Sequence, residues 1–186
     1  MSDNRFVLGA GVGWMKEEFD AYGVDFHTRG KRYDECIDSI RQLWTGEWTE
    51  YRGEHINFDS LRILPAPTRT VPIFLGGSSK IALRRCARIA DGFIGNGNSS
   101  AEVPELLGYL NGLRKKAGRA DLPFESVMGL TDAPSVETYK RLGDCGMTAG
   151  VNAPFAFTVG WKSTIEQKIA QMEQFADEFI RPLSDD

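Results

Sequence analysis

The chain has 186 residues, of which 41% are hydrophobic and 26% charged, and its formal net charge is −4 at pH 7. This composition is typical of a globular protein with a sizeable core, and it excludes a disordered tail, a collagen and a disulfide-stapled miniprotein. The acidic balance provides no basic face for nucleic acid, and the apolar runs fall short of the roughly 20 residues that cross a membrane. We therefore expect neither a nucleic-acid partner nor a membrane.

The cysteines and histidines indicate no covalent or metal framework. Cys36, Cys86 and Cys145 are odd in number and far apart, which favours reduced thiols in a cytoplasmic protein. No secretory signal is visible at the start of the chain. The histidines, His27 and His55, have no partner at metal-ligand spacing, so we expect no metal site.

In chain order, the first half alternates strand and helix signals. Residues 5–9 predict a strand, and residues 28–44 predict a helix because apolar residues recur there at the 3.6-residue period. Residues 48–51 and 55–58 flank Arg52-Gly53-Glu54 and predict a β-hairpin inserted before the next strand. Residues 71–75 predict that strand, and residues 80–90 the helix that follows.

The same alternation continues to the C-terminus. Residues 92–94 predict a very short strand, and residues 102–117 a helix with basic residues in its last turn and Gly118 just beyond its end. Residues 126–130 predict a strand, Pro134 opens a short helix, and residues 149–153 form another strand. Residues 163–166 have the capping-box pattern and predict a final amphipathic helix.

Strands that alternate with helices favour parallel strands covered by helices. Five βα units are too few for a closed eight-stranded barrel, which usually needs about 250 residues. No linker or low-complexity tract interrupts the chain, so residues 1–186 are expected to form a single α/β domain.

Two glycine-containing turns are the leading candidates for function. Gly11, Val12 and Gly13 follow the first strand, and if the extended backbone continues, Gly9, Gly11 and Gly13 share a face that a flat ring can approach. The alternative is a merely flexible turn. Trp14 stands where the dinucleotide-binding fingerprint needs its third glycine.

The second turn is Gly76-Gly77-Ser78-Ser79, between a strand and a helix. Unpaired N–H groups at a helix N-terminus favour a phosphate, and glycines let the backbone approach it. The alternative is that Ser78 or Ser79 only caps the helix. The remaining strand ends, at residues 95–97, 131–132 and 152–154, are weaker candidates. Asn96 and Asn152 offer amides there, although turn formation explains each of them singly.

No nucleophile–base motif is present, so no catalytic residue is assigned. His27 is interpreted as a surface or capping residue and His55 as structural. The four tryptophans are interpreted as core or rim packing. The absence of an acid–base pair fits redox chemistry, in which a bound cofactor performs the difficult step.

An ordered set of short motifs resembles the bacterial luciferase-like monooxygenases. In the first half of residues 5–95 these are Gly11-Val12-Gly13-Trp14, Glu17-Glu18-Phe19, Gly23-Val24, Arg29-Gly30-Lys31-Arg32, Asp34-Glu35 and Leu43-Trp44. In the second half they are Pro72-Ile73-Phe74-Leu75-Gly76-Gly77-Ser78-Ser79, Ala82-Leu83-Arg84-Arg85, Ala87-Arg88 and Ala90-Asp91-Gly92-Phe93. Beyond residue 101 only the βα rhythm and the final helix are similar.

The resemblance implies a (β/α)8 TIM-barrel-type fold, here a partial barrel of about five βα units with the inserted hairpin. It also implies an oxidoreductase or monooxygenase that binds FMN or the deazaflavin F-420 and acts on a small-molecule substrate. By resemblance, Gly76, Gly77, Ser78 and Ser79 hold the cofactor phosphate, and Gly11, Val12 and Gly13 lie beside the cofactor. The motif at Trp14 leans toward F-420.

Members of that family generally have three βα units before the strand at residues 5–9. The sequence is therefore expected to be a fragment, a mis-started reading frame or a shortened relative. Five strands leave open sheet edges and apolar faces, so we expect association, most simply as a homo-oligomer. Three functions stay open: the redox enzyme; a catalytically incomplete barrel that binds a flavin-like ligand or acts as a subunit; and an unrelated βα domain that binds a phosphorylated metabolite.

Overall fold

Residues 5–132 and 135–184 are described by the computed structural model of the chain, which divides into two units, Met1–Ile73 and Phe74–Asp186. The single domain expected over residues 1–186 stays a prediction. No helix among the described residues is long and apolar enough to span a bilayer.

The first unit contains one short strand, two helices and the hairpin. Its elements are β1 (Leu8–Ala10), α1 (Lys16–Ala21), the 3₁₀ turn η1 (Phe26–Thr28), α2 (Arg29–Leu43), β2 (Thr49–Arg52) and β3 (Asn57–Leu61). The Leu8 N–H donates to the Pro72 carbonyl over 2.9 Å. This bond places β1 beside the segment that leads into the next strand. Helix α1 and the 3₁₀ turn were not predicted.

The predicted hairpin is confirmed, with its strands shifted by one to three residues. β2 and β3 pair antiparallel, and Arg52 faces Asn57 across residues 53–56. Glu35 on α2 fixes this loop, because its carboxylate accepts the backbone N–H groups of residues 54, 55 and 56 over 2.8–2.9 Å. Burial is the largest single effect on the pKa of Glu35 and raises it. The three N–H bonds together outweigh burial, so the pKa of Glu35 is lowered.

The second unit repeats strand and helix. It contains β4 (Ile73–Gly76), α3 (Lys80–Ile89), β5 (Gly92–Asn98), α4 (Val103–Lys116), β6 (Glu125–Leu130), α5 (Val136–Asp144) and β7 (Ala149–Gly150). It ends with α6 (Pro154–Thr158), α7 (Ile165–Phe175), the π-helical turn η2 (Ala176–Ile180) and α8 (Arg181–Ser184). β4, β5, β6 and β7 are neighbours in that order and all pair parallel, as the alternation predicted.

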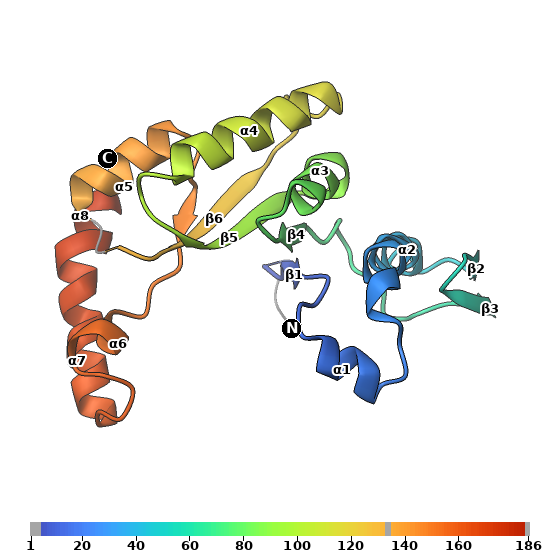
Figure 1. Ribbon diagram of the computed structural model, residues 1–186, viewed down its shortest axis with the longest axis horizontal. Coiled ribbons are helices and arrows are strands. Elements are labelled where there is room, and N and C mark those ends of the chain that lie inside the picture. The colour runs from blue at the N-terminus through green and yellow to red at the C-terminus, as the bar shows by residue number, and fades with distance from the viewer. Residues whose placement is uncertain (1–4, 133–134, 185–186) are drawn as a thin grey trace. The chain divides into compact units, whose positions relative to one another are not determined.

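Helices α3, α4 and α5 cover one face of these strands (Figure 1). That face holds the core, in which Leu75, Phe93 and Met128 are almost completely buried. Glycines make room for the large side chains, because a Cβ on Gly95 would lie 2.5 Å from the Met128 side chain. On the opposite face Ile94 and Val127 are only half-buried. Burial thus fixes which way β5 and β6 face.

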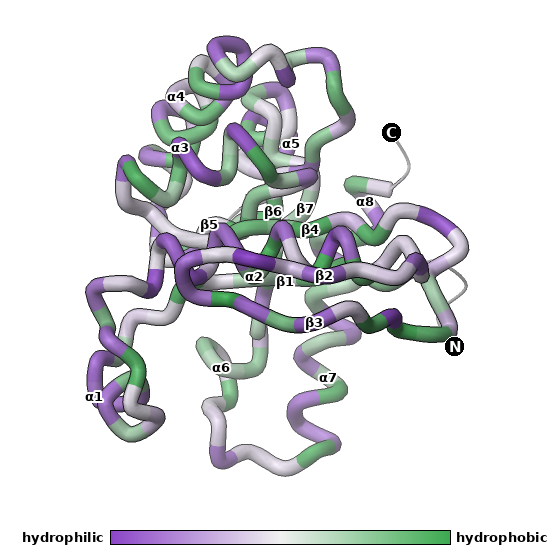
Figure 2. The backbone as a smooth tube through the Cα atoms, turned by 90° about the vertical axis from the view of Figure 1, so that its right-hand side faces the viewer, coloured by the Kyte–Doolittle hydropathy of each residue, from purple (hydrophilic) through white to green (hydrophobic). Residues whose placement is uncertain are grey.

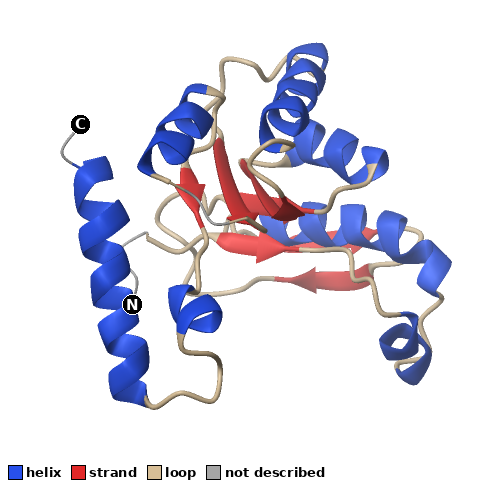
Figure 3. Cartoon of the chain, turned by 60° about the vertical axis from the view of Figure 1, so that its left-hand side comes forward, coloured by secondary structure: helices blue, strands red, loops and turns tan. Residues whose placement is uncertain are grey.

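The C-terminal segments run as one continuous helix from α7 through the π turn to α8 (Figure 3). Its capping box consists of Thr164 and Gln167, one residue later than the predicted pattern at residues 163–166. The Thr164 hydroxyl accepts the Gln167 N–H, so the first helical residue is Ile165. Figure 2 shows hydrophobic residues recurring along α7.

Other boundaries also differ from the predictions. β5 extends to Asn98, four residues beyond the predicted end, because its glycine- and asparagine-rich half continues to pair with β6. β7 is only two residues long, since Ala153 already caps α6. The start predicted at Pro134 lies outside the described residues, and α5 is capped by Ser135, whose side chain accepts the Thr138 N–H.

Candidate functional site at the strand ends

The turn between β4 and α3 brings the four predicted phosphate-binding residues together. Gly76 is the last residue of β4, and Ser79 is the N-cap of α3, where its hydroxyl oxygen accepts the Ala82 N–H over 3.1 Å. Gly77 has φ +123°, and a Cβ there would lie 2.8 Å from the Ala82 Cβ. Glycine is therefore required for the chain to turn this tightly against the helix.

The tip of α3 is open and rich in donors. Residues 77–81 are exposed, and the N–H groups of Ser78, Lys80 and Ile81 make no hydrogen bond within the described chain. Ser79 caps the helix, as the alternative interpretation held, but its hydroxyl proton is still available for donation. Such a tip attracts anions through its N–H groups and the helix dipole.

The end of β5 is shaped by the amide of Asn96. A Cβ on Gly129 of β6 would lie 2.6 Å from Asn96 Oδ1, so the Asn96 side chain lies directly over Gly129. Both residues belong to the half-buried face of the strands. The amide predicted here is therefore present at the surface of the sheet.

Two carboxylates hold the loop between β5 and α4. Asp132 belongs to a strand end that the sequence indicated as a weaker candidate, whereas Glu102 was not predicted. Glu102 accepts the Ser99 N–H and hydroxyl over 2.8 and 2.9 Å. Asp132 accepts the Ser100 hydroxyl and, over 2.8 Å, the Ser100 N–H. These bonds lower the pKa of both carboxyl groups. The Ser-x-x-Glu pattern at Ser99 could have revealed the first pair, but the second joins residues 32 positions apart.

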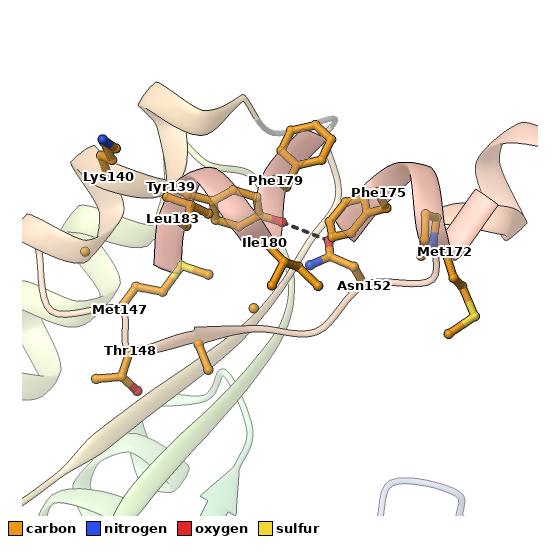
Figure 4. Close-up of a pocket in the computed structure, with 14 residues that line it drawn as sticks. Tyr139, Lys140, Met147, Thr148, Asn152, Met172, Phe175, Phe179, Ile180 and Leu183 are labelled. Carbon is orange, nitrogen blue, oxygen red and sulfur yellow. Dashed lines mark hydrogen bonds between the residues drawn. The ribbon is translucent and has the colours of Figure 1, made fainter. Parts of the chain in front are cut away.

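Asn152, at the end of β7, lies between two cavities. Its Oδ1 accepts the Tyr139 hydroxyl proton over 3.0 Å (Figure 4). The larger cavity, of about 580 Å³, lies among α5, β7 and the C-terminal helix and is mainly apolar. The smaller cavity, of about 270 Å³, opens at the ends of β6 and β7. Asn152, Phe175 and Phe179 line both of them.

In the first unit the glycine turn does not extend as expected. β1 ends at Ala10, and Gly13 has φ +82°, so Gly9, Gly11 and Gly13 do not form one continuous strand face. A Cβ on Gly13 would lie 2.7 Å from the Phe19 ring, whereas one on Gly11 would meet open space. Val12 is half-buried. Gly11 therefore keeps an approachable backbone, and Gly13 serves the packing of Phe19.

The structure also shows the surroundings of the other residues considered in the sequence. His27 is exposed, and its N–H donates to the Asp25 side chain. Trp14, Trp48 and Trp161 are 81%, 67% and 69% exposed, so these three do not pack in a core. Arg62 lies over the Trp48 ring and Phe155 packs edge-on against Trp161, which is the predicted alternative of packing at the rim. No group of three or more metal-ligating side chains lies together within residues 5–132 and 135–184.

Solved structures define the class of fold. The chain resembles the monooxygenase RslO1 from Streptomyces bottropensis, with a TM-score of 0.73 and 16% identity over 95% of this chain and 68% of that one. It also resembles the coenzyme F-420-dependent tetrahydromethanopterin reductase from Methanopyrus kandleri, with a TM-score of 0.69 and 16% identity over 98% and 75%. The fold is therefore a partial TIM barrel, as predicted.

The sequence model of the luciferase-like monooxygenases matches residues 1–131, and the chain belongs to that family. An uncharacterized protein of Mycobacterium tuberculosis strain H37Rv is 38% identical over 95% of this chain. An FMNH(2)-dependent dimethylsulfone monooxygenase of Pseudomonas fluorescens is 32% identical over 97%, and an F-420-dependent glucose-6-phosphate dehydrogenase of Nakamurella multipartita is 30% identical over 96%.

The chain spans 62%, 54% and 52% of the length of these three relatives, respectively. The predicted family is thus confirmed, and the alternative of an unrelated βα domain is wrong. The assignment of individual cofactor-binding residues stays a prediction.

Proposed function

We propose that the chain is part of an oxidoreductase that uses FMN or F-420 and that the tip of α3 holds the cofactor phosphate. Gly76 and Gly77 bring the backbone close, and Ser78 and Ser79 offer hydroxyl groups. The observation that supports this most is the set of unpaired N–H groups at an exposed helix start, at the carboxyl end of a parallel strand. Two relatives are named for FMNH(2) and F-420.

The part of the cofactor that the described residues fit best is its phosphate. An anion at this tip meets the positive end of the α3 dipole, and each N–H group can donate to a phosphate oxygen without losing another partner. The bound flavin or deazaflavin would supply the electron or hydride transfer. The protein's part here is to bind and orient the cofactor. Gly11, Val12 and Gly13 are assigned to the same cofactor by resemblance.

Titration tests the proposal. FMN and riboflavin share the ring, but only FMN has the phosphate, so their ratio of affinities reports the phosphate site. We expect FMN to bind at least about tenfold more tightly, because two or three charge-assisted hydrogen bonds exceed 1.4 kcal/mol in total. The affinities of F-420 and its phosphate-free deazaflavin core are compared in the same way and report the same phosphate site.

Ser78→Asp places a negative charge at the tip and should remove the preference for FMN. Ser60→Asp, at an exposed position on β3, is the matched control and should retain it. No binding of either cofactor would refute the proposal. Cofactor binding without turnover, with hydride donors or with O2, would instead indicate the catalytically incomplete barrel.

We also propose that the chain associates as a homo-oligomer. The support is a group of large apolar side chains that are 49–70% exposed on α7 and the segment that precedes it: Trp161, Ile165, Ile169 and Met172. Monomeric proteins seldom expose so many apolar groups together. Sedimentation velocity should show a dimer or larger species that Ile165→Lys/Ile169→Lys dissociates, and a heat-stable, monodisperse monomer would contradict the proposal.

A further inference from the structure

The smaller cavity at the ends of β6 and β7 has a distinctive lining. It combines three phenylalanines, two carboxylates, three side-chain amides and two threonines, with no Lys, Arg or His among the described residues that line it. The aromatic residues are Phe157, Phe175 and Phe179, and the carboxylates are Asp132 and Glu178. Ligands of βα folds bind at this edge of the strands.

The C-terminal helix brings two of the aromatic rings beside one of the carboxylates, because side chains four residues apart lie on the same helix face. Phe175 and Phe179 stack with ring centroids 4.6 Å apart, and Glu178 lies on the π-helical turn with Phe179. Tyr139 packs edge-on against Phe179 at 6.2 Å, which fixes that ring from outside the cavity. π turns of this kind often occur at functional sites.

The polar groups are held in place yet keep free acceptors. Asp132 is anchored by Ser100, and Glu178 accepts the Gln174 amide over 2.7 Å. A carboxylate has about four acceptor positions, so each still has capacity for a ligand donor. Arg141 attracts Asp132, but it donates to the Ser100 carbonyl over 3.2 Å and does not line the cavity.

We propose that this cavity binds an organic cation, with an ammonium group beside Asp132 and Glu178 and an apolar body against the three phenylalanines. Carboxylates attract the charge directly, and aromatic faces add a cation–π attraction. A phosphorylated or sulfonated ligand is disfavoured because its charge has the same sign as the lining. If the ligand is the substrate, which rests on the function proposed above, the substrate is an amine.

Binding is measured without flavin, so failure of the cofactor proposal leaves this test intact. The probes are 2-phenylethylammonium, 2-phenylethanol and 3-phenylpropanoate, titrated by ligand-observed NMR at pH 7 and low salt. The ammonium should bind about tenfold more tightly than the alcohol, from two exposed ion pairs and one cation–π contact, and the propanoate should bind most weakly.

Asp132→Asn/Glu178→Gln should reduce the ammonium-to-alcohol ratio to about two- to threefold, the part that the cation–π contact still supplies. Glu173→Gln removes an exposed charge from the same helix outside the cavity and should leave the ratio unchanged. Glu178→Gln alone, which spares the Asp132 loop, should lower the ratio about twofold without changing the melting temperature. Phe157→Ala should weaken the ammonium and the alcohol alike.

Equal affinity for the three probes, no binding at millimolar concentration, or a preference of about tenfold that survives undiminished in the double variant would overturn the proposal.

Discussion

Replacing Gly77 with alanine probes the turn on which the proposed phosphate site depends. Gly77 has φ +123°, and its new Cβ would lie 2.8 Å from the Ala82 Cβ, well inside carbon–carbon contact. The backbone strain costs about 1–3 kcal/mol and the close contact about 1–3 kcal/mol more. A lower entropy of the unfolded chain returns about 0.4–1 kcal/mol. We expect a net loss of about 2–4 kcal/mol.

Gly118→Ala is the matched control. Gly118 has φ +69°, but a Cβ there would meet open space, so the close contact is absent. The left-handed backbone cost of about 1 kcal/mol, less the same gain from the unfolded chain, leaves a net loss below about 1 kcal/mol. Both variants are measured by urea unfolding followed by far-UV circular dichroism. In a double-mutant cycle, Ala82→Gly should recover about 1 kcal/mol or more from Gly77→Ala, because the clashing methyl is gone. Equal losses for the two variants, or strict additivity in the cycle, would refute the reasoning.

Three further predictions concern local structure. Glu35→Gln should speed hydrogen exchange at the amides of residues 54–56. The pKa of Glu35 is lowered in the folded protein, so in the wild type these amides should be fully protected above the usual pKa of a glutamate, near 4.5. The protection should be lost as the pH falls through the lower pKa of folded Glu35. Cys86, whose pKa burial raises to about 12, should resist iodoacetamide at pH 8 until the protein unfolds, and labelling of native Cys86 would contradict this. Thr164→Ala should cost about 1 kcal/mol of unfolding free energy through loss of the cap of α7, and an unchanged urea midpoint would show that the cap contributes nothing.

The long periodic elements could be predicted from sequence because burial and local pattern agree there. Helix α4 begins and ends within one residue of its predicted bounds, with Gly118 at φ +69° just beyond it. Short elements such as α1 and α6 were not predicted, because five or six residues do not establish a helical period. The end of β7 was overestimated because the apolar run continues through Val151, which is 59% exposed.

The candidate site likewise has one part that could be predicted from sequence and one part that could not. The Gly76–Ser79 turn was visible because a strand, two glycines and a helix cap follow one another along the chain. The strand ends at residues 131–132 and 152–154, which line the smaller cavity, were named from sequence. The cavity that joins them to Glu178 was not visible, because its lining comes from three segments that only the fold brings together. Likewise, only the structure shows that Gly13, whose place beside the cofactor stays a prediction, makes room for Phe19.

The central claim is that the open tip of α3 binds the phosphate of a flavin-type cofactor. Amide chemical shifts in ¹⁵N-labelled protein test it most directly, with FMN, riboflavin and inorganic phosphate added in turn. We expect FMN and phosphate to shift the amides of residues 77–81 and riboflavin to leave these amides largely unmoved. If FMN binds while those amides stay in place, the phosphate is held elsewhere and the claim is contradicted.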